Sequence, residues 1–144
     1  KTMHWLPRKT VVVPIDFSDD AFAALKTAGE LATDQADLHI IHVLPLMEPT
    51  DPGIIWATVD DGSRRDHASK ALRQELTDRG FDGIDMVIRF GDPGHEIANY
   101  AAEVKAGLVV VSSHGQTALR HLLIGSVAER VVRLAHCPVL VLKQ

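Results

Sequence analysis

The chain has 144 residues, of which 46% are apolar and 24% charged, with a formal net charge of −4. This length and composition predict a globular protein with a continuous core, and we expect an extension at residues 1–9 and a single domain over residues 10–144. The acidic balance argues against nucleic acid as the main partner. No apolar stretch reaches the ~20 residues that cross a bilayer, and the first residues lack the apolar centre of a signal peptide. With Cys137 as the single cysteine, we expect an unexported, cytoplasmic protein without a membrane partner.

The domain opens with the run TVVVPI at residues 10–15, which is β-branched and apolar on both faces, as in a buried parallel strand. Asp16 follows this strand, and Ser18 is a good N-cap for a helix over about residues 19–33. The run LHIIHV at residues 38–43 predicts a second strand. Its two histidines are three positions apart and therefore face opposite sides of a strand, which excludes a metal pair.

Residues 44–62 are rich in proline and glycine and have no regular period. A segment of this length inside a small domain is usually functional or mobile. Ser63 and Asp66 have the spacing of a capping box and predict a helix over residues 63–79. The remaining expected elements are a strand at 84–90, a helix at 93–105, a strand at 108–111, a helix at 126–135 and a strand at 139–142.

Strands and helices therefore alternate along the whole domain. This order predicts an α/β fold, a doubly wound, open five-stranded parallel sheet with helices on both faces, which is Rossmann-like. In such sheets, ligands bind beyond the carboxyl ends of the strands, where the strand order reverses. The first, second and fourth strands would bring Asp16, Val43 and the loop from Ser112 to Gly115 to one crevice.

The stretch SSHGQTALRHLLIGS, from Ser112 to Ser126, joins the fourth strand to the last helix. Gly115 and Gly125 stand ten residues apart, and Ser126 lies where the helix should begin. Glycine lets a ligand approach the backbone closely, and the free N–H groups of a helix start stabilise an anion. A strand, a glycine loop and a helix start in this order predict a phosphate cradle. Ser126 serves equally well as a plain N-cap, and the two roles are compatible.

The strand-end sequence DFS, the loop SSHG and the closing run GSVAERVVRLAHCPVLVLK resemble the universal stress protein family, over residues 11–143. The most specific feature is the family's nucleotide signature, which is Gly, two residues, Gly, nine residues, Gly, and then Ser or Thr. Gly115, Gly125 and Ser126 match this signature, whereas Ser112 replaces its first glycine. A Cβ at that position weakens nucleotide binding if the backbone needs positive φ or must lie against the ribose.

The resemblance implies the adenine nucleotide alpha hydrolase-like version of this fold, with ATP, with or without Mg²⁺, bound in the crevice. AMP and cyclic AMP are alternative ligands. It implies that Asp16 contacts the ribose or a metal-bound water and that the backbone of Val43 meets the adenine edge. We expect no dedicated metal site. The nucleoside would be bordered by Val111 and Ser112, and the phosphates would be held by Ser113, His114, Gly115, Gly125, Ser126 and Val127. For His114, contact with phosphate and a role in shaping the turn both stay open.

These inferences predict an ATP-binding regulatory module of the stress response that responds to nucleotide. Homodimers are usual in such proteins, and we expect pairing through the last strand, formed by Val139, Leu140, Val141 and Leu142. The sequence contains no P-loop, no G-x-G-x-x-G and no G-x-S-x-G, which argues against an enzyme. The alternatives are a nucleotide-free dimeric interaction module and a slow ATPase.

Overall fold

The computed structural model describes residues 4–48, 50, 60–114 and 124–143. Every predicted strand and helix is present, and each boundary lies within two residues of its expected position. In chain order the elements are β1 (Val11–Pro14), α1 (Asp19–Leu31), the 3-10 turn η1 (Gln35–Asp37), β2 (Leu38–Leu44), α3 (Asp61–Asp78), β3 (Asp85–Phe90), α4 (Pro93–Glu103), β4 (Leu108–Ser112), α5 (Ser126–Leu134) and β5 (Val139–Leu142).

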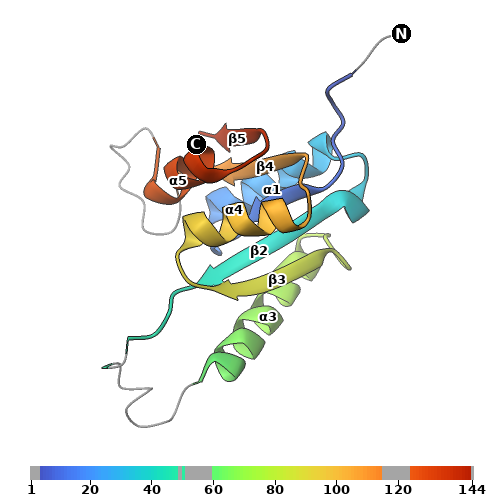
Figure 1. Ribbon diagram of the computed structural model, residues 1–144. Coiled ribbons are helices and arrows are strands. Elements are labelled where there is room, and N and C mark those ends of the chain that lie inside the picture. The colour runs from blue at the N-terminus through green and yellow to red at the C-terminus, as the bar shows by residue number, and fades with distance from the viewer. Residues whose placement is uncertain (1–3, 49, 51–59, 115–123, 144) are drawn as a thin grey trace.

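The five strands form one parallel sheet in the order β3-β2-β1-β4-β5 (Figure 1). The register places Val11 of β1 opposite Leu38 of β2 on one side and Leu108 of β4 on the other. From β1 the chain moves outward to β2 and β3, and then returns to add β4 and β5 beyond β1. The predicted doubly wound topology is confirmed, and the strand order reverses between β1 and β4.

Helices cover both faces of the sheet, and each face has its own apolar core. Helices α1 and α3 pack on one face, where Leu25 and Leu72 are fully buried against strand residues such as Val13 and Ile40. Helices α4 and α5 pack on the other face, where Ile97 and Val131 meet the remaining strand residues, and α4 lies across the near side of the sheet in Figure 1. Within the described ranges, no helix has the length and apolar character needed to cross a membrane.

Helix α3 begins two residues earlier than the sequence predicts. Its N-cap is Asp60, whose carboxylate accepts a hydrogen bond from the Ser63 amide at 2.7 Å, while the Ser63 hydroxyl accepts from the Asp60 amide at 3.4 Å. The capping box expected from Ser63 and Asp66 is therefore wrong. An aspartate three residues upstream caps at least as well as serine, and Ser63 takes the reciprocal position that Glu usually holds. The prediction for Ser18 is confirmed, because its hydroxyl accepts from Ala21 at 3.1 Å.

Arg8 attaches the start of the chain to the amino edge of the sheet, opposite the carboxyl ends of the strands. Its amide donates to Leu31, its carbonyl accepts from Thr33, and its Nε donates to Gly107 at 3.2 Å. Its guanidinium lies 4.7 Å from the centre of the exposed Trp5 ring. Arg8, within the segment predicted as an extension, is thus fixed to the domain.

Candidate functional site

The turn after β1 carries Asp16 at the carboxyl edge of the sheet. Oδ1 of Asp16 accepts two hydrogen bonds from Ser18, one from the amide at 3.1 Å and one from the hydroxyl at 2.5 Å. Between them, Phe17 has a φ of 66°, which is uncommon for a bulky residue. Ser18 also caps α1, so the position of the Asp16 carboxylate is tied to the start of that helix.

An aromatic cluster lies beneath this turn. The Phe17 ring meets His42 edge-on, with centroids 4.9 Å apart at 84°, and meets Phe22 at 6.4 Å and 75°. Nδ1 of the buried His42 lies 2.6 Å from the carbonyl oxygen of Ile15. Since a carbonyl can only accept, Nδ1 carries the hydrogen and donates it. His42 therefore fixes both the ring of Phe17 and the carbonyl of Ile15, the residue that follows β1.

Sequence reasoning considered the histidines of β2 only as metal ligands and assigned His42 no other role. The structure places the pair on opposite faces, as predicted: His39 Nδ1 lies 3.8 Å from Asp85 Oδ2, whereas His42 packs under Phe17 on the α1 face. The available signal was a polar residue at a core-facing strand position, which needs a buried partner. Its partner, Ile15, is 27 residues away.

Val43 presents free backbone groups beside the end of β1. The carbonyl of Ile41 points toward β1, because it accepts from the Ile15 amide at 2.9 Å. In a strand, the N–H and C=O groups of every second residue point toward the same neighbouring strand, so those of Val43 also point toward the β1 side. β1 has ended there, and none of the described residues bonds to either group.

The end of β4 is buried and bonded within itself. Val111, Ser112, Ser113 and His114 are exposed by at most 9%. The Ser112 hydroxyl donates to the His114 carbonyl at 2.8 Å, the Ser113 hydroxyl lies 3.1 Å from His114 Nδ1, and the Ser113 amide donates to Leu142 at 2.7 Å. Ser112 belongs to the extended strand and has no positive φ. Ser112 therefore replaces the signature glycine without having to adopt a left-handed backbone conformation.

Gly125 joins the start of α5 to the end of β4. Its amide donates to the Ser113 carbonyl at 2.5 Å, and a Cβ at Gly125 would lie 2.9 Å from that oxygen. With a φ of −76°, this glycine is needed for close approach rather than for positive φ. Gly125 is the N-cap and Ser126 the first helical residue, so the plain N-cap role suggested for Ser126 is wrong. Gly115 lies outside the described residues.

The first turn of α5 supplies hydrogen-bond donors beside the end of β4. Gly125 has no side chain to cap the helix, and the amides of Ser126 and Val127 find no acceptor among the described residues. Both residues are exposed. A helix start of this kind stabilises a bound anion through its N–H groups and its dipole.

The carboxyl edge of the sheet therefore combines three kinds of group at the place where the sequence predicts the crevice. The order β2-β1-β4 brings the backbone of Val43 and the carboxylate of Asp16 to one edge of the sheet, and the hydrogen bond from Gly125 to Ser113 attaches the start of α5 to the end of β4 at the same edge. These groups can match the edge of a flat base, the hydroxyls of a sugar and an anion. Among the described residues, no group of three or more His, Cys, Asp or Glu side chains could hold a metal ion on its own.

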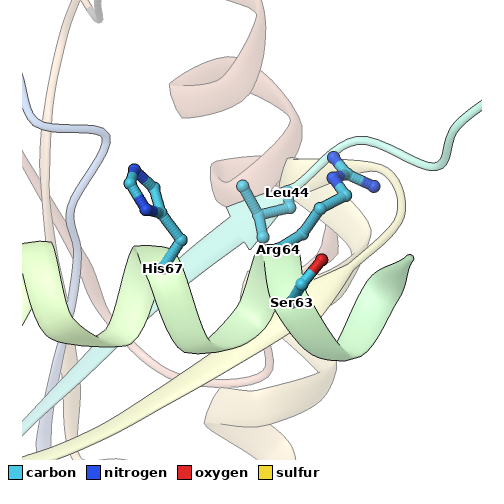
Figure 2. A pocket seen from close by; sticks show the side chains of 4 residues that line it. All are labelled: Leu44, Ser63, Arg64 and His67. Atoms are coloured by element: carbon cyan, nitrogen blue, oxygen red, sulfur yellow. The ribbon is translucent and has the colours of Figure 1, made fainter. Parts of the chain in front are cut away.

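A hollow lies on the face of the sheet that α1 and α3 cover. It has a volume of about 430 Å³ and lies between the end of β2 and the first turns of α3, lined by Leu44, Ser63, Arg64 and His67 (Figure 2). Arg64 is already engaged, because it donates to the Pro45 carbonyl at 2.8 Å and its guanidinium lies 5.3 Å from the Phe90 ring centre. Leu44 packs with the α1 and α3 core and Val43 with the opposite core, so this hollow lies on the other side of β2 from the Val43 side chain.

The strand order defines a doubly wound, Rossmann-like α/β domain, and the candidate site lies at the switch point where that order reverses. The model of the universal stress protein family matches residues 7–143. The chain is 34% identical over 142 residues to universal stress protein MJ0531 of Methanocaldococcus jannaschii, covering 94% of this chain and 82% of that protein. This chain belongs to the universal stress protein family.

Solved structures agree with this assignment. The structure of protein MJ0577 of Methanocaldococcus jannaschii has a TM-score of 0.76 at 29% identity, covering 96% of this chain and 98% of that one. A universal stress protein in complex with cAMP has a TM-score of 0.66 at 28% identity, covering 94% and 97% of the two chains.

Proposed function

We propose that this protein binds an adenine nucleotide in the crevice between β1 and β4 and acts as a nucleotide-responsive regulatory module. ATP is the proposed ligand, with AMP and cyclic AMP as alternatives. The observation that carries the proposal is the start of α5, where the amides of Ser126 and Val127 have no acceptor among the described residues. The cAMP complex of a related universal stress protein supports a nucleotide as the ligand class.

The remaining groups of the crevice fit the other parts of a nucleotide. The backbone of Val43 suits the base, and Asp16 suits the ribose hydroxyls or a water bound to Mg²⁺. A single carboxylate is enough for the latter role, because Mg²⁺ bound to nucleotides takes its other ligands from phosphate and water. Hydrogen bonds to charged phosphate contribute about 1.5–3 kcal/mol each. A few of them, after the cost of association, correspond to affinities near the micromolar range, about −8 kcal/mol.

The sharpest test removes one amide and leaves the helix in place. Proline is tolerated at the first position of a helix, and Gly125 before it has the extended backbone that proline requires (ψ 164°). Ser126→Pro should weaken ATP binding by about 10- to 100-fold, the loss of one charge-assisted hydrogen bond. The matched control, Ser126→Ala, removes only the hydroxyl.

Isothermal calorimetry with ATP, AMP and cyclic AMP measures both variants after bound nucleotide has been removed. Equal ATP affinity in the wild type and Ser126→Pro would show that the α5 amide does not contact the ligand. An absence of binding by the wild type at millimolar nucleotide would refute the proposed function itself.

We further propose that the protein forms a homodimer through β5. This strand lies at the edge of the sheet and pairs only with β4 among the described strands. An apolar edge strand such as Val139–Leu142 readily pairs with a second copy.

A nucleotide-free interaction module is the second candidate, and a specific observation favours it. The amide of Gly125 is already bonded to Ser113, and the hydroxyl of Ser112 to His114, so part of the loop is closed on itself. A mass spectrum of the denatured purified protein separates the two candidates, because a co-purified adenine nucleotide is expected only for the first.

A further inference from the structure

Just past the end of β1, Ile15 makes only one of the two backbone hydrogen bonds to β2 that a parallel ladder would give it. Ile15 donates its amide to the Ile41 carbonyl at 2.9 Å. In a regular parallel ladder, the Ile15 carbonyl would next accept from the amide of Val43. The Ile15 carbonyl instead accepts a hydrogen bond from Nδ1 of His42 at 2.6 Å. No described residue accepts a hydrogen bond from the Val43 amide. A side chain has taken the place of a backbone donor.

The substituting side chain is held firmly. His42 is 9% exposed, and Phe17 packs against it edge-on with centroids 4.9 Å apart. The imidazole lies on the α1 face of the sheet, whereas the side chain of Val43 lies on the α4 and α5 face. The Val43 amide points in the plane of the sheet between them, into the space past the end of β1.

We propose that His42 is a positioning residue that keeps the backbone of Val43 free for the nucleobase. This inference rests on the proposed function. Adenine offers a ring nitrogen acceptor next to an amino donor, which matches the N–H and C=O of one residue. Guanine offers the reverse polarity, a ring N–H next to a carbonyl. By occupying the carbonyl of Ile15, His42 would therefore favour adenine over guanine nucleotides.

The first test concerns the protein without nucleotide. Amide exchange followed by NMR should be at least about tenfold faster at Val43 than at Ile41, whose amide lies inside the ladder. In His42→Phe the ring remains but the donor is lost, so the Ile15 carbonyl should accept from Val43 and slow its exchange. His42→Asn is the matched control, because the asparagine amide nitrogen can take the place of Nδ1. Protection of Val43 equal to that of Ile41 in the wild type would overturn the inference, whether or not His42→Phe folds.

The second test measures affinity. His42→Phe should weaken ATP binding by about tenfold, the loss of one hydrogen bond, and leave GTP binding unchanged, while His42→Asn stays within about twofold of the wild type. Equal ATP affinity in the wild type and His42→Phe would refute the role of His42 alone. No nucleotide binding by the wild type would refute the proposed function, and the role of His42 with it.

Discussion

Gly94 shows how closely two helices approach in this fold. A Cβ at this position of α4 would lie 2.7 Å from Cβ, Cγ and Cδ of Arg130 on α5. Cβ of Arg130 is bonded directly to the backbone of α5, so it cannot move away unless the helix moves with it. Gly125 has the same constraint toward a backbone carbonyl, so loss of function in a Gly125 variant would not by itself identify a ligand contact.

Gly94→Ala should therefore destabilise the protein by about 1–3 kcal/mol, although alanine is the better helix former. Gly29→Ala is the matched control, because the nearest atom to its added Cβ, Phe81 Cε1, is 3.8 Å away. That control should gain about 0.5–1 kcal/mol. Urea unfolding of both variants measures the difference, and a stabilised Gly94→Ala would contradict the close packing of α4 on α5.

Cys137 should react slowly with thiol reagents. It is half-buried, and burial raises the pKa of its thiol above the usual 9.0, while the nearby positive charge of Arg8 acts in the opposite direction. The thiolate is the reactive form, so iodoacetamide should alkylate Cys137 more slowly at pH 8 than it alkylates a free thiol. The rate of alkylation should continue to increase as the pH rises above 9.0. The urea-unfolded chain is the control. Equal rates in the folded and unfolded protein would show that the thiol is not shielded.

At the scale of elements, the start of α4 is held by one carboxylate that accepts three hydrogen bonds from two residues. Asp92 accepts from the His95 amide at 3.0 Å and from His95 Nδ1 at 2.7 Å, and pairs with Arg130 at 2.6 Å. The hydrogen bond from the His95 side chain is the main reason that the pKa of Asp92 is lowered. Asp92 thus links the cap of α4 to α5.

Asp92→Asn keeps a good N-cap and removes the charge. It should lower the free energy of unfolding at pH 7 by no more than about 1 kcal/mol, because the carboxylate is partly exposed and screened. Because the folded-state pKa of Asp92 is lowered, the charged carboxylate stabilises the fold at pH values above its ordinary pKa of 3.8. This stabilisation is lost as the pH falls through the folded-state pKa. The free energies of unfolding of the wild type and the variant, measured by urea titration, should therefore become equal at low pH. A difference that persists at the lowest pH would contradict the electrostatic origin.

The elements were predictable because their signals are local. Apolar runs and the Ser18 cap lie within a few residues of the structure they specify. The start of α3 was missed because two valid capping patterns overlap there. The partners of Gly125 and His42 were not predictable, since Ser113 and Ile15 are brought to them only by the packed sheet.

At the scale of the whole molecule, the edge strand β5 provides a test of the proposed dimer. Val109 donates to the Pro138 carbonyl and Ser113 to the Leu142 carbonyl, so by alternation the amide of Val141 points away from β4. Proline is tolerated on an edge strand where its nitrogen faces outward. Val141→Pro should therefore leave the fold intact and weaken dimerisation by at least about tenfold.

Sedimentation velocity measures this effect, with Val141→Thr as the control that keeps the amide. An unchanged dimer in Val141→Pro, with an unchanged melting temperature, would exclude backbone pairing through β5.

The two ends of the described chain lie at opposite edges of the sheet. Arg8 is anchored to Gly107 at the amino edge, whereas Leu142, next to the exposed Lys143, accepts from Ser113 beside the crevice. Immobilising the protein through an amino-terminal tag would therefore leave the crevice facing solution. A fluorophore attached to Lys143 would lie close to the crevice and could report its occupancy directly.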